Sequence, residues 1–117
     1  MVTQGRCRSN RAAMCEEVWL AALDPTVGSE IQKTRPCLVV SPPEMNGGPR
    51  IIMAAPLTKG SRPAPSRIAV LFQDRAGLIL LDQLRALDKS RLIRRLGVIP
   101  ADTLTRTLAR LREIFEE

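Results

Sequence analysis

Apolar residues are gathered along most of the chain in short runs that are separated by turn-forming residues. Gly, Pro and Ser concentrate between the runs, which span residues 15–23, 37–42, 50–57, 67–72 and 78–87. Runs of this length, bounded by such residues, are typical of β-strands. We therefore predict about five strands, and "GVIP" at 97–100 can add one more short strand.

The periodicity changes near the C-terminus. An apolar stripe at helical spacing is formed by Leu104, Leu108, Leu111 and Phe115. This stripe predicts an amphipathic helix over 101–117, with Asp102 able to cap its first turn. A shorter helical turn or helix is predicted over 88–97, started by Asp88 and ended by Gly97.

Strands followed by helices favour an α+β fold built on a small antiparallel barrel or curled sheet. The length of 117 residues fits one domain with a modest core. Residues 1–13 are polar and basic without periodicity, so we predict a flexible N-terminal arm followed by a single domain over 14–117.

The chain carries a net charge of +6 and has a pI near 10.2. Such a field attracts polyanions, of which RNA and DNA are the commonest, although an acidic protein partner fits equally well. Histidine and tyrosine are both absent. Acid–base chemistry is therefore limited to carboxylates, lysines, cysteines and arginines.

The three cysteines are an odd number without C-x-x-C spacing. This argues against a disulfide framework and a thiolate zinc site, so we expect no metal and no cofactor. Cys37, inside an apolar run, is interpreted as a small buried side chain. No window resembles a membrane span or a secretory signal, so a soluble cytoplasmic protein is expected.

Four motifs occur in a fixed order along the chain. The segments "EVWLAALDPTVGSEIQKTRPCLVVSP", "MAAPLT" and "LLDQLRALDKSRL" contain D-P-T-x-G-S-E, T-R-P, A-P-L-T and D-Q-x-R. In this combination the chain resembles the MazF/PemK family of toxin endoribonucleases from about Met14 to the C-terminus. The resemblance implies an SH3-like barrel, sequence-selective RNA cleavage, a homodimer, and a MazE-like antitoxin whose acidic C-terminal segment covers the RNA groove.

Three residues are candidates for catalysis. Arg35 follows a polar loop, and its planar guanidinium suits two phosphate oxygens; an ion pair with Glu30 or Asp82 is the structural alternative. Thr58 ends an apolar run, where its hydroxyl can bind a phosphate or merely its own loop. Glu30 can fold back onto Arg35 to orient it or to accept a proton. The resemblance implies that Arg35 is catalytic and contacts the scissile phosphate, that Thr58 takes part in cleavage, and that Glu30 is functional.

Further polar residues are candidates for RNA binding. Lys33, Thr34, Lys59 and Arg62 belong to the loops at 25–34 and 58–66, and Gln83 lies at the end of an apolar strand. Asp82 matches an Asp that some relatives are thought to use as general base, helped by an Arg two positions earlier. Here that position is Leu80, so we favour a buried structural Asp82 bonded to loop backbone.

RNA carries its own nucleophile, the 2′-hydroxyl. An enzyme that uses it needs only a clamp that aligns the reacting atoms and positive charge where the phosphorane forms. We therefore predict a metal-independent, single-strand endoribonuclease that leaves a 2′,3′-cyclic phosphate and a 5′-hydroxyl. The alternative is a non-catalytic basic binding module, or a gyrase-directed toxin of the same fold. Leucine-rich stripes at 78–87 and 104–115 give thin support to dimerisation.

Overall fold

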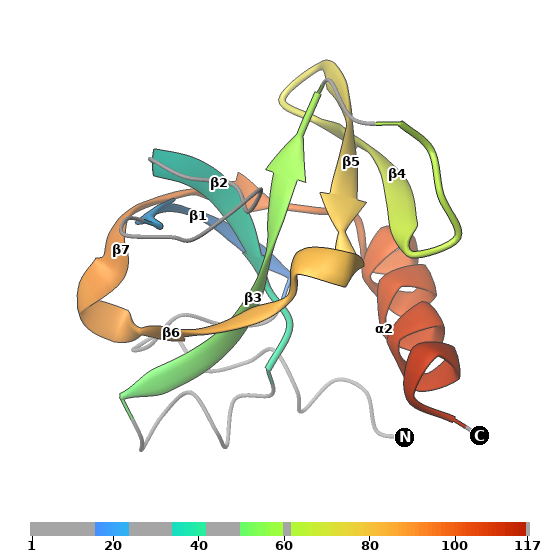
Figure 1. Ribbon diagram of the computed structural model, residues 1–117. Coiled ribbons are helices and arrows are strands. Elements are labelled where there is room, and N and C mark those ends of the chain that lie inside the picture. Colours follow the sequence, from blue (N-terminus) through green and yellow to red (C-terminus); the bar gives the residue numbers. More distant parts are fainter. Residues whose placement is uncertain (1–15, 24–33, 42–49, 60–61, 117) are drawn as a thin grey trace.

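The computed structural model describes residues 16–23, 34–41, 50–59 and 62–116, in which an antiparallel sheet curls on itself and an α-helix follows at the C-terminal end (Figure 1). The described strands are β1 (Glu17–Ala22), β2 (Thr34–Val39), β3 (Ile51–Thr58), β4 (Arg67–Phe72), β5 (Arg75–Leu80), β6 (Arg85–Asp88) and β7 (Leu92–Val98). The pairing path runs β4-β5-β3-β2-β1-β7, and β6 pairs with β3. The structure confirms the predicted α+β class.

The long strand β3 is the reason that the sheet curls. Its first half, from Ile51 to Ala54, pairs with β6, whereas Leu57 and Thr58 pair with β5. The opposite edge of β3 pairs with β2 over residues 54–56. Successive residues of a strand face opposite sides of the sheet, and two apolar clusters form in this way: Leu38 and Leu57 belong to one, and Val39 and Ile52 belong to the other.

The apolar runs of the sequence supply both clusters. Side chains of β1, β2, β3 and β5 are fully buried, among them Val18, Leu38, Ile52, Ala55 and Ile79. Hydrophobic strands of this kind are expected where a sheet wraps around its own interior. The predicted strands at 15–23, 37–42, 50–57 and 67–72 are all confirmed within one to three residues.

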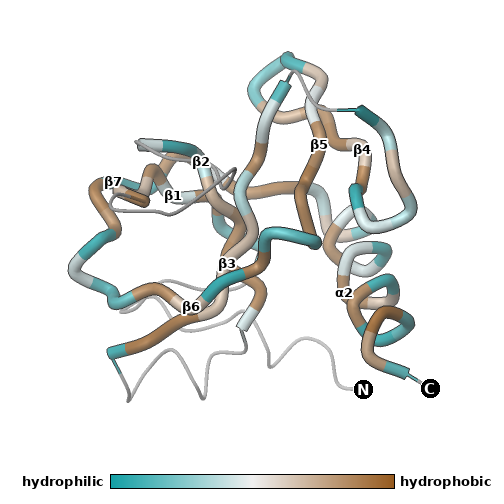
Figure 2. The backbone as a smooth tube through the Cα atoms, in the orientation of Figure 1, coloured by the Kyte–Doolittle hydropathy of each residue, from teal (hydrophilic) through white to brown (hydrophobic). Residues whose placement is uncertain are grey.

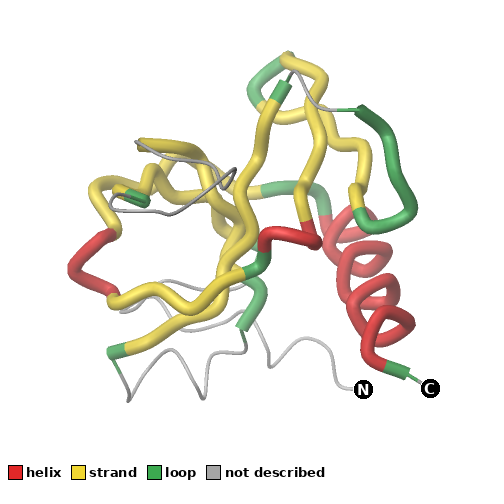
Figure 3. The backbone as a smooth tube through the Cα atoms, viewed as in Figure 1, coloured by secondary structure: helices red, strands yellow, loops and turns green. Residues whose placement is uncertain are grey.

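The run over 78–87 was predicted to be one strand, and this prediction is wrong. A 3₁₀ turn, η2 (Leu81–Gln83), separates β5 from β6, and Figure 3 shows it in red between yellow strands. The turn lets the chain leave β5 and return along the other half of β3. The polar pair Asp82 and Gln83 lies at this corner, but buried Leu80 before it and Leu87 after it make the run read as one strand.

Of the two alternatives for 88–97, the helical turn is present and the longer helix is wrong. Asp88 caps the 3₁₀ turn η3 (Lys89–Arg91) by accepting a hydrogen bond of 2.9 Å from the Ser90 backbone N–H. The chain then extends into β7, which pairs with β1. Tertiary pairing with β1 overrides the local helical pattern here, so Gly97 lies in a strand and ends no helix.

The C-terminal helix α2 (Ala101–Phe115) confirms the predicted amphipathic helix, but two details differ. Pro100 is its N-cap residue, and Asp102 makes no capping hydrogen bond. The stripe begins with fully buried Leu104 and ends with Phe115, which is 74% exposed. Figure 2 shows apolar and polar segments alternating along α2, beside the apolar lengths of β4 and β5.

Two further predictions concern membrane spans and the N-terminal arm. Among the described residues, no helix has the length and apolar content needed to cross a membrane. The predicted basic arm, residues 1–13, lies outside the described residues.

Candidate functional site

Arg35 and Thr58 are brought together by the pairing of β2 with β3. In this antiparallel ladder Cys37 lies across from Pro56 and Leu38 across from Ala55. The same register, extended by two residues, places Arg35 across from Thr58. Because directly opposed residues of an antiparallel pair share one face of the sheet, the T-R-P and A-P-L-T motifs converge at one end of β2 and β3.

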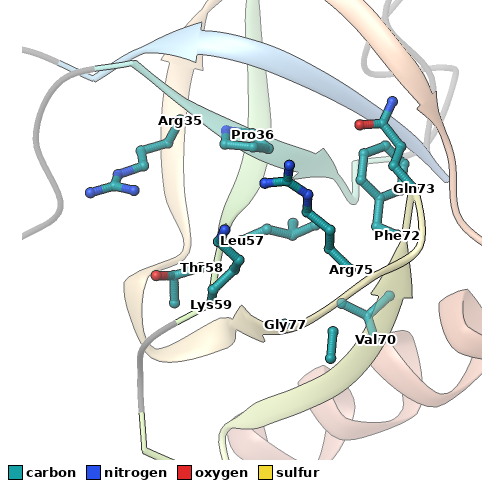
Figure 4. Close-up of a pocket in the computed structure, with 11 residues that line it drawn as sticks. Arg35, Pro36, Leu57, Thr58, Lys59, Val70, Phe72, Gln73, Arg75 and Gly77 are labelled. Atoms are coloured by element: carbon teal, nitrogen blue, oxygen red, sulfur yellow. The ribbon is translucent and has the colours of Figure 1, made fainter.

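Both residues line a cleft of about 700 Å³ between β2 and the β4–β5 hairpin (Figure 4). We call it the cationic cleft, and its lining residues are Arg35, Pro36, Leu57, Thr58, Lys59, Val70, Phe72, Gln73, Arg75, Ala76 and Gly77. In Figure 4, Arg35 and Thr58 lie towards one end of the cleft, and Phe72 and Gln73 lie towards the other. An elongated ligand can therefore be contacted at more than one point.

The lining is positively charged. Arg35, Lys59 and Arg75 contribute three cations, and no acidic side chain is among the lining residues that the structure describes. In the described part of the chain, no carboxylate forms an ion pair with Arg35. Asp82 forms an ion pair with Arg67. The alternative in which Arg35 pairs with Asp82 is therefore wrong. The Arg35 guanidinium is exposed and can receive an anion.

Gly77 fixes how closely β5 approaches Thr58. A Cβ atom placed on Gly77 would lie 2.9 Å from the Thr58 carbonyl oxygen. That oxygen is backbone and cannot rotate away, so the close approach of the two strands at the cleft requires glycine at this position.

Replacing Gly77 with Ala is therefore expected to push Thr58 out of place. We expect the free energy of unfolding to fall by about 1–3 kcal/mol, as overpacking commonly costs. Urea unfolding measures this loss of stability; Gly97→Ala, which meets the movable Phe72 ring at 3.3 Å, is the matched comparison. A Gly77→Ala protein with wild-type stability would contradict this account.

Asp82 and Gln83 lie elsewhere, in a second cleft of about 320 Å³. Asp82 accepts two hydrogen bonds from Arg67, one from Nε at 3.3 Å and one from Nη2 at 3.1 Å. The Arg67 guanidinium lowers the pKa of Asp82 and Asp82 raises that of Arg67. The Asp82 side chain is 39% exposed, so the prediction that it is buried is wrong. Its carboxylate forms an ion pair with Arg67.

The remaining predicted residues are divided between the described and the undescribed parts of the chain. Lys59 lines the cationic cleft, whereas Thr34 and Arg62 are exposed outside its lining. The Arg62 carbonyl accepts a hydrogen bond of 3.1 Å from Arg67. Glu30 and Lys33 lie outside the described residues.

Sequence reasoning missed Arg75 and its neighbours Phe72 and Gln73, which line the cationic cleft. They belong to the β4–β5 hairpin, whose sequence "FQDR" lacks the usual Asn-Gly or Asp-Gly turn pair. The sequence predicts the strand at 67–72 and the next one at 78–87, with residues 73–77 between them. The only sequence feature that points to Arg75 is its position directly after a tight turn. A sequence alone does not show which part of the molecule such a turn faces.

Cys37 is buried, as predicted. Burial raises the pKa of its thiol to about 12, and the nearby Arg85 charge lowers it by less. At neutral pH the side chain is therefore a protonated thiol and no nucleophile. The described residues contain no group of three or more His, Cys, Asp or Glu side chains arranged to hold a metal ion.

Comparison with known proteins agrees with this geometry. The fold is similar to that of crystalline MazF from Deinococcus radiodurans, with a TM-score of 0.79 and 27% identity over 90% of this chain and 97% of that one. A MazE-MazF complex from the same organism matches with a TM-score of 0.67 and 28% identity, covering 91% of this chain and 97% of that one.

Residues 15–115 match the family described as PemK-like, MazF-like toxin of type II toxin-antitoxin system. The endoribonuclease PemK of Escherichia coli is 36% identical over 105 residues, which cover 85% of this chain and 79% of that protein. The chain belongs to the PemK/MazF toxin family.

Proposed function

We propose that the chain is a toxin endoribonuclease that cuts single-stranded RNA by means of the RNA's own 2′-hydroxyl, without a metal ion. The observation that carries the proposal is the placement of Arg35 and Thr58, from two separate motifs, in one cleft with further cations and no described acidic lining. Relatives named endoribonuclease support the reaction class.

The proposed reaction is an in-line transfer at phosphorus. The 2′-oxygen attacks the phosphorus atom and loses its proton, the bond to the 5′-oxygen breaks, and that oxygen gains a proton. The fragments end in a 2′,3′-cyclic phosphate and a 5′-hydroxyl. Negative charge grows on the non-bridging oxygens, so charged and hydroxyl donors placed there lower the barrier.

Arg35 and Thr58 fit the two roles that this reaction requires. The guanidinium of Arg35 stays charged at any relevant pH and can hold both non-bridging oxygens with its planar fork. The Thr58 hydroxyl, half-buried at the end of β3, can donate one more hydrogen bond. Glu30 remains the candidate that orients Arg35 or accepts the proton, as its position in the sequence suggested.

Asp82 is proposed to be a structural residue, since its two oxygens bind Arg67 and it lies in the second cleft. Replacing Asp82 with Asn should therefore reduce cleavage at neutral pH by less than about 10-fold, whereas loss of a general base costs about 10²–10⁴-fold. A larger loss in a folded Asp82→Asn protein would make Asp82 the base.

The same variant should change the response to acid. The pKa of Asp82 is lowered in the folded protein, so its contribution to stability is present above the ordinary carboxyl pKa and is lost as pH falls from about 4. Asp82→Asn lacks this contribution at every pH. Its melting temperature should be lower at pH 7 and should fall less steeply below pH 4 than that of the wild type.

We further propose that an antitoxin with an acidic segment inhibits the chain by occupying the cationic cleft. The MazE-MazF complex among similar structures and the charge of the lining support this partner. A homodimer remains a proposal drawn from the resemblance. The stripe at 78–87 no longer supports it, because Ile79, Leu80, Leu81 and Leu87 are buried within one chain.

The test of the proposed function is incubation of a mixed-sequence RNA with the purified protein in excess EDTA. We expect cleavage of single-stranded RNA and none of DNA, which lacks the 2′-hydroxyl. No cleavage at high protein concentration, or cleavage only after magnesium is added, would overturn the proposal. Cleavage-site mapping from the same reaction yields the preferred sequence.

A further inference from the structure

We propose that Arg75 is a second phosphate-binding residue of the cationic cleft, and that Phe72 and Gln73 latch its hairpin onto β7. The inference rests on the proposed function. It specifies which part of the RNA Arg75 binds, namely a phosphate other than the one being cleaved. Four features of the β4–β5 hairpin and of the cleft support it.

The turn of the hairpin is conformationally costly. Phe72 lies across from Arg75, so Gln73 and Asp74 form a two-residue turn. Both have positive φ angles, 52° and 63°. Such turns favour Asn and Gly, and glutamine gains nothing from this conformation by itself. We infer that a contact of the Gln73 side chain offsets the cost of its positive φ angle.

That contact reaches across to β7. The side-chain amide of Gln73 donates a hydrogen bond of 3.1 Å to the Leu96 carbonyl oxygen. The Phe72 ring lies against Gly97, since a Cβ atom there would be 3.3 Å from the ring. The first and last strands of the pairing path, β4 and β7, are thus joined at this point by side chains. We call these two contacts the latch.

The latch fixes the backbone from which Arg75 projects. In Figure 4 the Arg75 side chain extends into the cleft towards Pro36, on the opposite wall. Among the described residues no carboxylate forms an ion pair with Arg75. A guanidinium held over a cleft without a described acidic partner is suited to an incoming anion.

Two arginines on opposite walls fit a polynucleotide better than a single anion. Arg35 projects from β2 and Arg75 from β5, and the cleft of about 700 Å³ lies between them. The half-buried Phe72 ring beside Arg75 gives an apolar surface, against which a base can stack. RNA offers successive phosphates with bases between them, so Arg75 takes a neighbouring phosphate while Arg35 takes the scissile one.

The experiment measures binding and cleavage separately. A pool of short, fluorescent 2′-O-methyl RNA oligonucleotides, which cannot be cut through the 2′-oxygen, is titrated with protein at several salt concentrations. For Arg75→Ala we expect a Kd about 10-fold higher and a salt slope smaller by about 0.7, the value for one phosphate contact on a single strand. At saturating cleavable RNA, kcat should stay within about 3-fold of the wild type, because Arg75 does not contact the reacting phosphate.

Two further variants separate the latch from general stability and charge. Gln73→Gly removes the latch hydrogen bond and also relieves the positive φ, so it should weaken RNA binding without lowering the melting temperature. Arg94→Ala removes one exposed charge from β7, outside the cleft lining, and should leave the salt slope nearly unchanged.

An Arg75→Ala protein with wild-type Kd and salt slope would overturn the inference. So would an equal change in Arg94→Ala, since the effect would then come from net charge alone. Gln73→Gly with wild-type binding would remove the latch from the account. A wild-type protein that binds the oligonucleotides but cuts no RNA would instead overturn the proposed function and leave these binding measurements valid.

Discussion

Replacement of Arg35 with Ala is expected to lower the single-turnover rate of RNA cleavage by about 10³-fold, within the range found when one preorganised donor or an arginine is removed from a transition state. The fold should be retained, because Arg35 is exposed at the start of β2 and has no described ion-pair partner. Far-UV circular dichroism and the melting temperature check the fold beside the rate.

Two variants define what Arg35 provides. Arg35→Lys keeps one positive charge but loses the planar fork, so it should recover only part of the rate. Arg94→Ala removes an exposed arginine from β7, outside the cleft, and should cut RNA as the wild type does. A folded Arg35→Ala enzyme with the wild-type rate would show that the scissile phosphate lies elsewhere.

An oligonucleotide with a single 2′-deoxyribose at the cleavage site should be cut at least about 10⁵-fold more slowly than the all-ribose oligonucleotide. The reason is that the nucleophile belongs to the substrate, and effective molarities of well-placed intramolecular nucleophiles reach about 10⁵–10⁸ M. The rate is measured by gel analysis of end-labelled substrate under single-turnover conditions.

The control is the same oligonucleotide with the deoxyribose moved to a nucleotide away from the cleavage site. It should be cut at close to the normal rate and should compete with equal affinity. Rapid cleavage of the oligonucleotide modified at the site would mean that water or a protein group attacks the phosphorus. The clamp proposed for Arg35 and Thr58 would then lack its main justification.

Much of the fold could be predicted because burial leaves a clear mark on the sequence. Strands such as β3 and β4 are short apolar runs between Pro, Gly and Ser, and the last helix shows its stripe. The pairing of Arg35 with Thr58 was also within reach, since two motifs at neighbouring strand ends are brought together by an antiparallel ladder.

What could not be predicted depends on contacts between distant residues. The segment Leu92–Val98 has a helical pattern of leucines but becomes a strand, because β1 offers an unpaired edge. Asp82 was expected to be buried, and it is exposed beside Arg67 instead, 15 residues away in the sequence. No local signal distinguishes these outcomes.

Only one wall of the cationic cleft could be predicted from the sequence. One wall carries the family motifs with Arg35 and Thr58, but the opposite wall consists of a hairpin whose residues match none of those motifs. Arg75 lines the cleft because its hairpin lies across from β2, and Gln73 at the hairpin's turn contacts β7, which is far away in the sequence. Such a placement follows from the assembled sheet alone.

The most direct measurement is the mass of the RNA fragments formed in excess EDTA. If the ribose attacks its own chain while Arg35 neutralises the phosphorane, every upstream fragment should carry a 2′,3′-cyclic phosphate at first and every downstream fragment a 5′-hydroxyl. Fragments that end in a 3′-hydroxyl and a 5′-phosphate would contradict the account, because water would then have been the nucleophile.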